Sequence, residues 1–143
     1  MSIHEIEAGR NPVRRVQGET LEELFELAGL AAFDIGWDLS AVTATYPRPI
    51  VGAGDTPGEL LACWIEELLT AAGRDGIVFG SFVVDRLEEG GVQGSASGLF
   101  VDEVPRTQAR VIGLADRPEP VAVPEGWWVD LAFVTERTLR SVD

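Results

Sequence analysis

The residues best suited to chemistry in this sequence are paired carboxylates, and Asp34 with Asp38 is the leading pair. The two lie four residues apart at the end of a segment with helical periodicity, so a helix running through both would turn them to one side. Two carboxylates on one side could hold a divalent cation. The alternative is a solvated helix end, where the helix dipole disfavours carboxylates. Asp102 and Glu103 form a weaker pair that fits an exposed turn better.

The side chains that usually carry out catalysis do not form a set. His4 is the only histidine, and its place in the N-terminal segment offers no pocket to position it as an acid or base. Cys63 stands beside an apolar helical stripe without an obvious base to activate it, so we interpret it as a small, semi-buried residue. Serines 81, 95 and 97 lack the context of a nucleophile elbow. The sequence therefore predicts a protein that is not an enzyme.

The charge of the chain separates classes of partner. Its 143 residues include 24 acidic and 11 basic ones, for a formal net charge of −13, and every basic residue is an arginine. A field of that sign repels phosphate backbones and disfavours direct nucleic-acid binding. A basic protein or a cation is favoured as the partner, and the alternative is that the charge only maintains solubility.

Length and composition predict one globular domain over residues 1–143. Apolar residues make up 45% and charged residues 24% of the chain, both near globular averages. We expect flexible tails at 1–10 and 136–143. A single cysteine cannot form an internal disulfide and fits a reducing cytoplasm. No apolar run approaches the roughly 18 residues of a membrane span.

Two amphipathic helices are predicted, at 20–34 and from 57 to about 73. Each begins at a threonine N-cap with a glutamate three residues later, the pattern of a capping box: Thr20 with Glu23, and Thr56 with Glu59. Gly73 is well placed to end the second helix. The two starts echo each other 36 residues apart, which indicates a duplicated strand–helix unit or, nearly as well, convergent capping.

Extended segments make up the rest of the chain. They are rich in β-branched residues and separated by turn residues, and lie at 12–17, 41–46, 77–87, 92–100, 107–115, 121–123 and 127–134. Pro47 and Pro49 follow the second segment and indicate an edge or a bend. The order predicts an α+β fold in which two amphipathic helices pack on a mixed, mostly antiparallel β-sheet.

Three stretches resemble the archease family. They are G-x-T-L-E-E-L-F at 18–25, L-L-x-x-W-I-x-E-L-L at 60–69 and G-W-x-V at 126–129. The three occur in the family's order and with near-family spacing, and the resemblance covers roughly residues 8–135.

The resemblance implies a function. Members of the archease family are small acidic proteins that assist the RtcB-type RNA ligase in tRNA splicing and RNA repair. They promote loading of guanylate onto the ligase and let it turn over repeatedly. The resemblance implies a cytoplasmic, non-enzymatic accessory protein whose partner is such a ligase, without direct contact to nucleic acid or membrane. The alternative is a diverged acidic protein-binding scaffold with an unrelated partner.

The family's metal-binding residues match poorly. Members bind a divalent cation such as calcium through aspartates near both chain ends, the first of them in an H-T-A-D motif. Here Ala8 stands at the histidine position, Asn11 at the first aspartate and Val134 at the second. Hard cations need several oxygen ligands, usually with two or more carboxylates. The resemblance therefore implies a degenerate site without a cofactor, with Asp34, Asp38 and Asp143 as weak candidates for a replacement.

Arg110 and Trp128 are the residues that we expect to contact a partner. Arg110 stands where the family has a lysine and keeps its charge, whereas Gly113 replaces a family threonine. Trp127 and Trp128 are adjacent in a strand, so they point to opposite faces, with Trp127 inward. An exposed tryptophan often anchors an interface, and the alternative is that the C-terminal tail covers Trp128.

Overall fold

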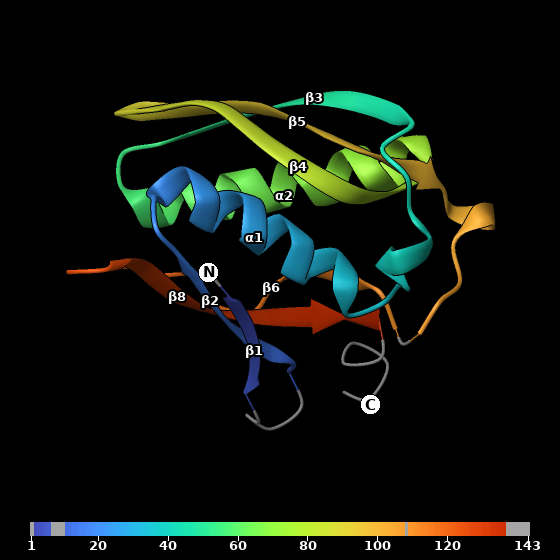
Figure 1. The fold of residues 1–143 in the computed structure, drawn as a ribbon, viewed down its shortest axis with the longest axis horizontal. Coiled ribbons are helices and arrows are strands. Elements are labelled where there is room, and N and C mark those ends of the chain that lie inside the picture. Colours follow the sequence, from blue (N-terminus) through green and yellow to red (C-terminus); the bar gives the residue numbers. More distant parts are fainter. Residues whose placement is uncertain (1, 7–10, 108, 137–143) are drawn as a thin grey trace.

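The computed structural model describes residues 2–6, 11–107 and 109–136. Within this part the helices and strands follow in the order β1 (Ser2–Ile6), β2 (Val13–Gly18), α1 (Leu21–Asp34), η1 (Leu39–Ala41), β3 (Tyr46–Gly54), α2 (Pro57–Asp75), β4 (Ile77–Glu88), β5 (Gly90–Phe100), η2 (Val101–Glu103), β6 (Val111–Leu114), β7 (Val121–Val123) and β8 (Gly126–Thr135). The two α-helices lie between two β-sheets (Figure 1).

Both helices begin at the predicted N-cap residues. The hydroxyl of Thr20 accepts a hydrogen bond from the N–H of Glu23 at 3.1 Å, and Thr56 accepts one from Glu59 at the same distance. The two glutamate carboxylates reach back to the main-chain N–H groups of the residues before the caps, Glu19 and Asp55. These bonds satisfy N–H groups that have no partner within the helix, which fixes where each helix starts.

Helix α2 ends three residues later than predicted. Gly76, not Gly73, is the C-cap, with φ 65° and ψ 39°, and its N–H donates to the carbonyl of Ala72. This left-handed conformation strongly favours glycine. Gly73 lies inside the helix, where an added Cβ would meet no atom within 4 Å, so the glycine there neither ends the helix nor relieves crowding.

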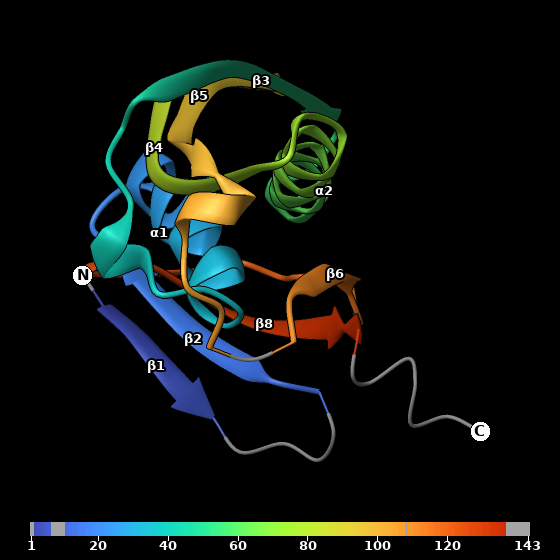
Figure 2. The ribbon, with the colours of Figure 1, turned by 90° about the vertical axis from the view of Figure 1, so that its right-hand side faces the viewer.

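The predicted α+β class is confirmed, but the strands form two sheets instead of one. The five-stranded sheet has the order β1–β2–β8–β6, with β7 also paired to β8, and the three-stranded sheet has the order β3–β5–β4. Every pairing between described strands is antiparallel. The reason lies in α1, whose buried residues extend beyond one side of the helix and must be covered from two directions: Leu24, Phe25, Ala28, Gly29, Ala31, Ala32 and Phe33. It contacts β4 above and β2 and β8 below (Figures 1 and 2).

Two strand predictions need correction. The segment 41–46 is not a strand: it follows η1, and the strand β3 begins only at Tyr46 and contains both prolines. Because β3 is an edge strand and Pro47 and Pro49 are two residues apart, both missing N–H groups fall on its free edge. The predicted strand at 107–115 is reduced to β6.

The N-terminal segment was expected to be a tail, yet Ser2–Ile6 forms β1. It pairs with β2 along its length, with Ile3 opposite the buried Val16. Residues 1 and 7–10, and residues 137–143 of the expected C-terminal tail, lie outside the described part.

The core fills the space between the sheets. The indole of Trp64 on α2 is fully buried and donates a hydrogen bond to the carbonyl of Phe25 on α1 at 3.0 Å. Phe33 packs edge-on against Phe79 of the three-stranded sheet, with ring centroids 5.6 Å apart. Among the described helices, none is long and apolar enough to cross a membrane.

Candidate functional site

Asn11 and Val134, the two positions that correspond to metal-binding aspartates, lie together at one corner of the five-stranded sheet. The N–H of Phe133 donates to the carbonyl of Pro12 at 3.0 Å, and Val13 pairs with Ala132. Continuing this register sets Asn11 across from Val134. Gly113 of β6 pairs with Val134 on its other side. The antiparallel pairing of β2 and β8 therefore brings residues from both ends of the chain to one place.

This corner does not supply the ligands of a divalent cation. Asn11 offers one neutral oxygen, Oδ1, which is buried and has no hydrogen-bond partner among the described residues. The half-buried Val134 offers no donor atom. Across the described ranges, no three His, Cys, Asp or Glu side chains form a group that could hold a metal ion. Hard cations take six or more oxygen ligands, so the residues present do not fit the cation that the family resemblance implies.

The other candidate carboxylates are not brought to this corner or to one another. Helix α1 ends at Asp34, so the helical spacing that would align Asp34 with Asp38 is lost. Asp38 instead caps η1, where its Oδ1 accepts from the N–H of Ser40 at 3.1 Å and from the hydroxyl at 2.5 Å. Asp102 and Glu103 are exposed in η2. Asp143 and Ala8 lie outside the described residues.

A network of two arginines and one glutamate lies beside the corner. Glu136 accepts from Arg106 Nη2 at 2.8 Å on one oxygen and from Arg110 Nε at 2.7 Å on the other. The Arg106 hydrogen bond, with that of Arg110, holds the pKa of Glu136 below its usual range. The Arg106 guanidinium also stacks over Trp37, 5.3 Å from the ring centroid. Glu136, two residues after Val134, is thus already paired with two protein cations.

Sequence reasoning named Arg110 only as an expected partner contact, and it missed Arg106 and Glu136. Glu136 was assigned to a tail, whereas its N–H donates to the carbonyl of Arg110 and extends the ladder between β6 and β8. Arg106 sits in an irregular segment, where spacing along the sequence carries no directional signal. The one hint in the sequence is that Arg106 stands four residues before Arg110.

Arg110 also lines an open cleft between α2 and β6, which lie one above the other in Figure 2. The cleft has a volume of about 460 Å³, within the range of pockets that hold small ligands or side chains. Its polar lining consists of Glu66, Thr70 and Arg110, and its larger apolar side chains are Phe33, Trp37, Leu69, Ile77, Val101 and Ile112.

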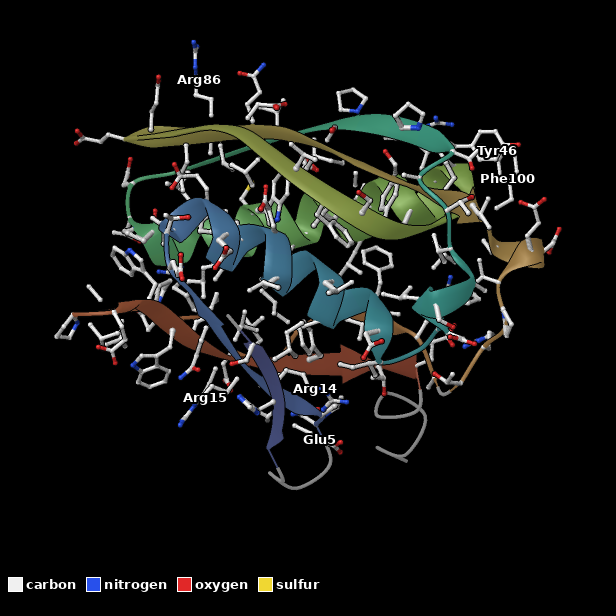
Figure 3. All side chains as sticks on the ribbon, viewed as in Figure 1. Glu5, Arg14, Arg15, Tyr46, Arg86 and Phe100 are labelled. Carbon is white, nitrogen blue, oxygen red and sulfur yellow. The ribbon has the colours of Figure 1, made fainter. Side chains whose placement is uncertain are left out.

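Trp128 lies on the outer face of the five-stranded sheet, as predicted from strand alternation. Its neighbours in the strand, Trp127 and Val129, turn toward the core. The Arg15 guanidinium stacks over the Trp128 ring, 4.6 Å from its centroid, and binds both oxygens of Asp130 at 2.8 and 2.9 Å. Figure 3 shows Arg15 projecting from this sheet away from the helices. One face of the ring is therefore covered by Arg15.

Cys63 and His4 lie in different layers of the fold. Cys63 is half-buried on α2, and its Sγ accepts from the N–H of Ala53 at 3.4 Å. His4 is exposed on β1 of the five-stranded sheet, whereas Cys63 packs against β3 of the three-stranded sheet. The helix layer separates the two side chains, which cannot act as a nucleophile and its base.

Comparisons with known proteins point to one family. The model described as "Archease protein family (MTH1598/TM1083)" matches residues 13–111. Protein archease of Pyrococcus furiosus is 31% identical over 121 residues, which is 80% of this chain and 84% of that protein. Protein archease of Methanopyrus kandleri is 38% identical over 101 residues, which is 68% and 72% of the two chains. The matched range 13–111 contains neither Asn11 nor Val134.

The fold also has a solved counterpart. The solution structure of Methanobacterium thermoautotrophicum protein 1598 aligns with a TM-score of 0.76 over 93% of this chain and 96% of that one. The sequence identity over this alignment is 24%, so the likeness speaks for the fold alone. It agrees with the arrangement of two helices and antiparallel sheets described above.

Proposed function

The chain belongs to the archease family, and on that premise we propose that it is a non-enzymatic accessory protein of an RtcB-type RNA ligase. We propose further that it acts without a divalent cation at the Asn11–Val134 corner. The observation that carries the second part is the composition of that corner, where an amide and an isopropyl group stand in place of two carboxylates.

The charge of the chain supports a basic protein as the partner. A formal net charge of −13 attracts a partner that presents a positive surface, as an enzyme that grips RNA must. Electrostatic complementarity of this kind raises the rate of association and weakens with added salt. The same charge disfavours direct binding of the accessory protein to the RNA.

The network around Glu136 supports an ion-free corner. Two guanidinium groups bind the two carboxylate oxygens at 2.7 and 2.8 Å and tie β8 to the segment before β6. These ion pairs hold the strand ends at the corner together through the protein's own side chains. A bound cation would have to compete with two arginines for the carboxylate of Glu136.

The test is a reconstitution with the RNA ligase encoded in the same genome. At low ionic strength the two purified proteins should form a complex on a sizing column, and added salt should weaken it. Joining of RNA ends should continue for more turnovers per ligase when the accessory protein is present. Absence of a complex at low salt, where attraction is strongest, would rule out the ligase and leave the acidic scaffold with an unrelated partner.

A further inference from the structure

The cleft between α2 and β6 is lined by a side of α2 that packs only partly against the core. Glu66, Leu69, Thr70 and Gly73 line it, and their spacing of three, four and seven residues places them in one stripe along the helix. The α2 residues buried in the core form a different stripe: Leu60, Leu61, Trp64, Ile65, Leu68 and Ala71. The cleft stripe is therefore a second surface of the same helix, open to solvent.

The opposite wall of the cleft exposes apolar surface. Ile112 of β6 is 40% exposed although it is a large aliphatic residue. Val101 and Leu69 add half-buried aliphatic surface from η2 and α2. Removing such surface from water stabilises a complex by roughly 25 cal/mol per Å², so an apolar side chain inserted here would contribute to binding.

The charges around the cleft favour a cationic occupant. Glu66 lines the cleft, Asp34 follows the lining residue Phe33, and Asp102 and Glu103 follow the lining residue Val101. All four carboxylates are exposed, and none takes part in an ion pair with another described residue. Among the described residues, Arg110 is the one cationic residue of the lining, and it shares the carboxylate of Glu136 with Arg106, which lies over the lining residue Trp37.

We propose that this cleft is the docking groove for a segment of the partner protein in which an apolar side chain is flanked by arginine or lysine. The apolar side chain enters between Leu69 and Ile112, and the basic side chains pair with Glu66 and with the exposed carboxylates that follow Phe33 and Val101 in the chain. Arg110 has N–H donors beyond the one bound to Glu136, and these suit a main-chain carbonyl of the bound segment. The proposal rests on the proposed function, because it names the surface that would engage the basic partner.

The direct test measures binding of a synthetic probe to the full chain. The probe is a fluorescein-labelled peptide, Gly-Arg-Leu-Arg-Leu-Arg-Gly, blocked at both ends and followed by fluorescence anisotropy. Glu66→Lys should weaken binding about tenfold, a change of about 1.4 kcal/mol. The matched control is Glu125→Lys, which makes the same charge change in the turn before β8. Gly126, the first residue of β8, lies against Gly18 and Glu19 just before the start of α1, whereas the cleft is lined by Phe33 near the end of α1. The control should therefore change the affinity less than about twofold.

A second pair of variants tests the apolar wall. Ile112→Ser should weaken binding about three- to fivefold, whereas Val51→Ser, at a more exposed valine on the three-stranded sheet (59% exposed), should leave it unchanged. All four substituted residues are exposed or line the surface, and thermal melts confirm that each variant folds. Equal losses within either pair, or no binding of the peptide to the unmodified chain, would overturn the proposal.

The same variants separate this proposal from the proposed function. If the unmodified chain binds the ligase and Glu66→Lys binds it equally well, the cleft is not the docking groove and the accessory role stands. If the peptide behaves as expected but the ligase does not bind the unmodified chain, the groove stands and the ligase is the wrong partner.

Discussion

The side chains of Asn11 and Val134 determine what the corner of the five-stranded sheet can bind. The backbone there is built for two side chains to meet, since β2 and β8 pair up to Pro12 and Phe133. Only the side-chain chemistry is unsuited to a cation. A neutral amide oxygen and a methyl-bearing side chain cannot offset the cost of removing a divalent ion from water.

Restoring the two carboxylates should therefore create a cation site. We expect the double variant Asn11→Asp, Val134→Asp to be stabilised by excess calcium, by about 2.7 kcal/mol when the ion is at about 100 times its dissociation constant. In a thermal melt this is a shift of several degrees, and the unmodified protein should show none. Without calcium the double variant should melt below the unmodified protein, because two facing carboxylates repel. A calcium-dependent shift in the unmodified chain would show that a site survives elsewhere.

The family resemblance relates Asn11 and Val134 to one metal site, but the sequence does not place Arg110 beside them, because periodicity does not say which strand ends meet. The structure supplies the pairing of β2 with β8 and of β6 with β8. Glu136 and Arg106 could not be predicted, because their contact joins side chains from an irregular segment and a strand end. Such contacts follow from tertiary packing and leave no local pattern.

At the scale of elements, Asp75 joins the end of α2 to the edge strand β3. It binds Arg48 at 2.8 Å and Arg74 at 3.1 Å. Hydrogen bonds from Arg74 and then Arg48 lower the pKa of Asp75 from 3.8 to about 2. The folded state therefore holds this carboxylate ionised at pH values where the unfolded chain would protonate it, so the pair stabilises the fold above the unfolded pKa.

We expect Asp75→Asn to lower the free energy of unfolding at neutral pH, measured by urea denaturation. The difference from the unmodified protein should shrink as the pH falls from about 4 to about 2, because the carboxylate is then protonated in both states. Asp116→Asn is the control, since Asp116 is exposed and has no ion pair with a described residue. A stability difference for Asp75→Asn that does not change with pH would contradict this account.

Substituting the two glycines near the end of α2 should change the stability of the protein in opposite directions. Gly73→Ala should stabilise the protein by about 0.5–1 kcal/mol, because Gly73 is helical and a Cβ there meets open space. Gly76→Ala should destabilise it by about 1 kcal/mol, since φ is 65° at this cap. Urea denaturation of both variants measures the effects, and a destabilising Gly73→Ala would show that the helix ends earlier.

Elements with strong local signals were predicted well, and those fixed by distant contacts were not. The helix starts at Thr20 and Thr56 and the hairpin of β4 and β5 follow from capping and turn residues. The division into two sheets does not, because it depends on α1 being covered from both sides. The choice of Gly76 over Gly73 as the end of α2 also escaped prediction, because either glycine could adopt the left-handed cap.

At the scale of the whole molecule, charge and layering assign different roles to different surfaces. The helices lie between the sheets (Figure 2), and one flank of α2 lines the cleft. The other exposed aromatic contacts are local: Tyr46 stacks on Phe100 with centroids 4.5 Å apart at one end of the three-stranded sheet (Figure 3). The net charge of −13 then attracts a basic partner to the molecule, and the cleft offers apolar surface to which it can bind.

The measurement that tests this account most directly is the affinity of the purified chain for the RNA ligase of the same genome, taken once with a chelator and once with excess calcium. The account predicts binding in both conditions, with dissociation constants equal within about twofold, because Asn11 and Val134 lack the carboxylates that would recruit the ion. Binding that appears only when calcium is present, or no binding in either condition, would contradict it.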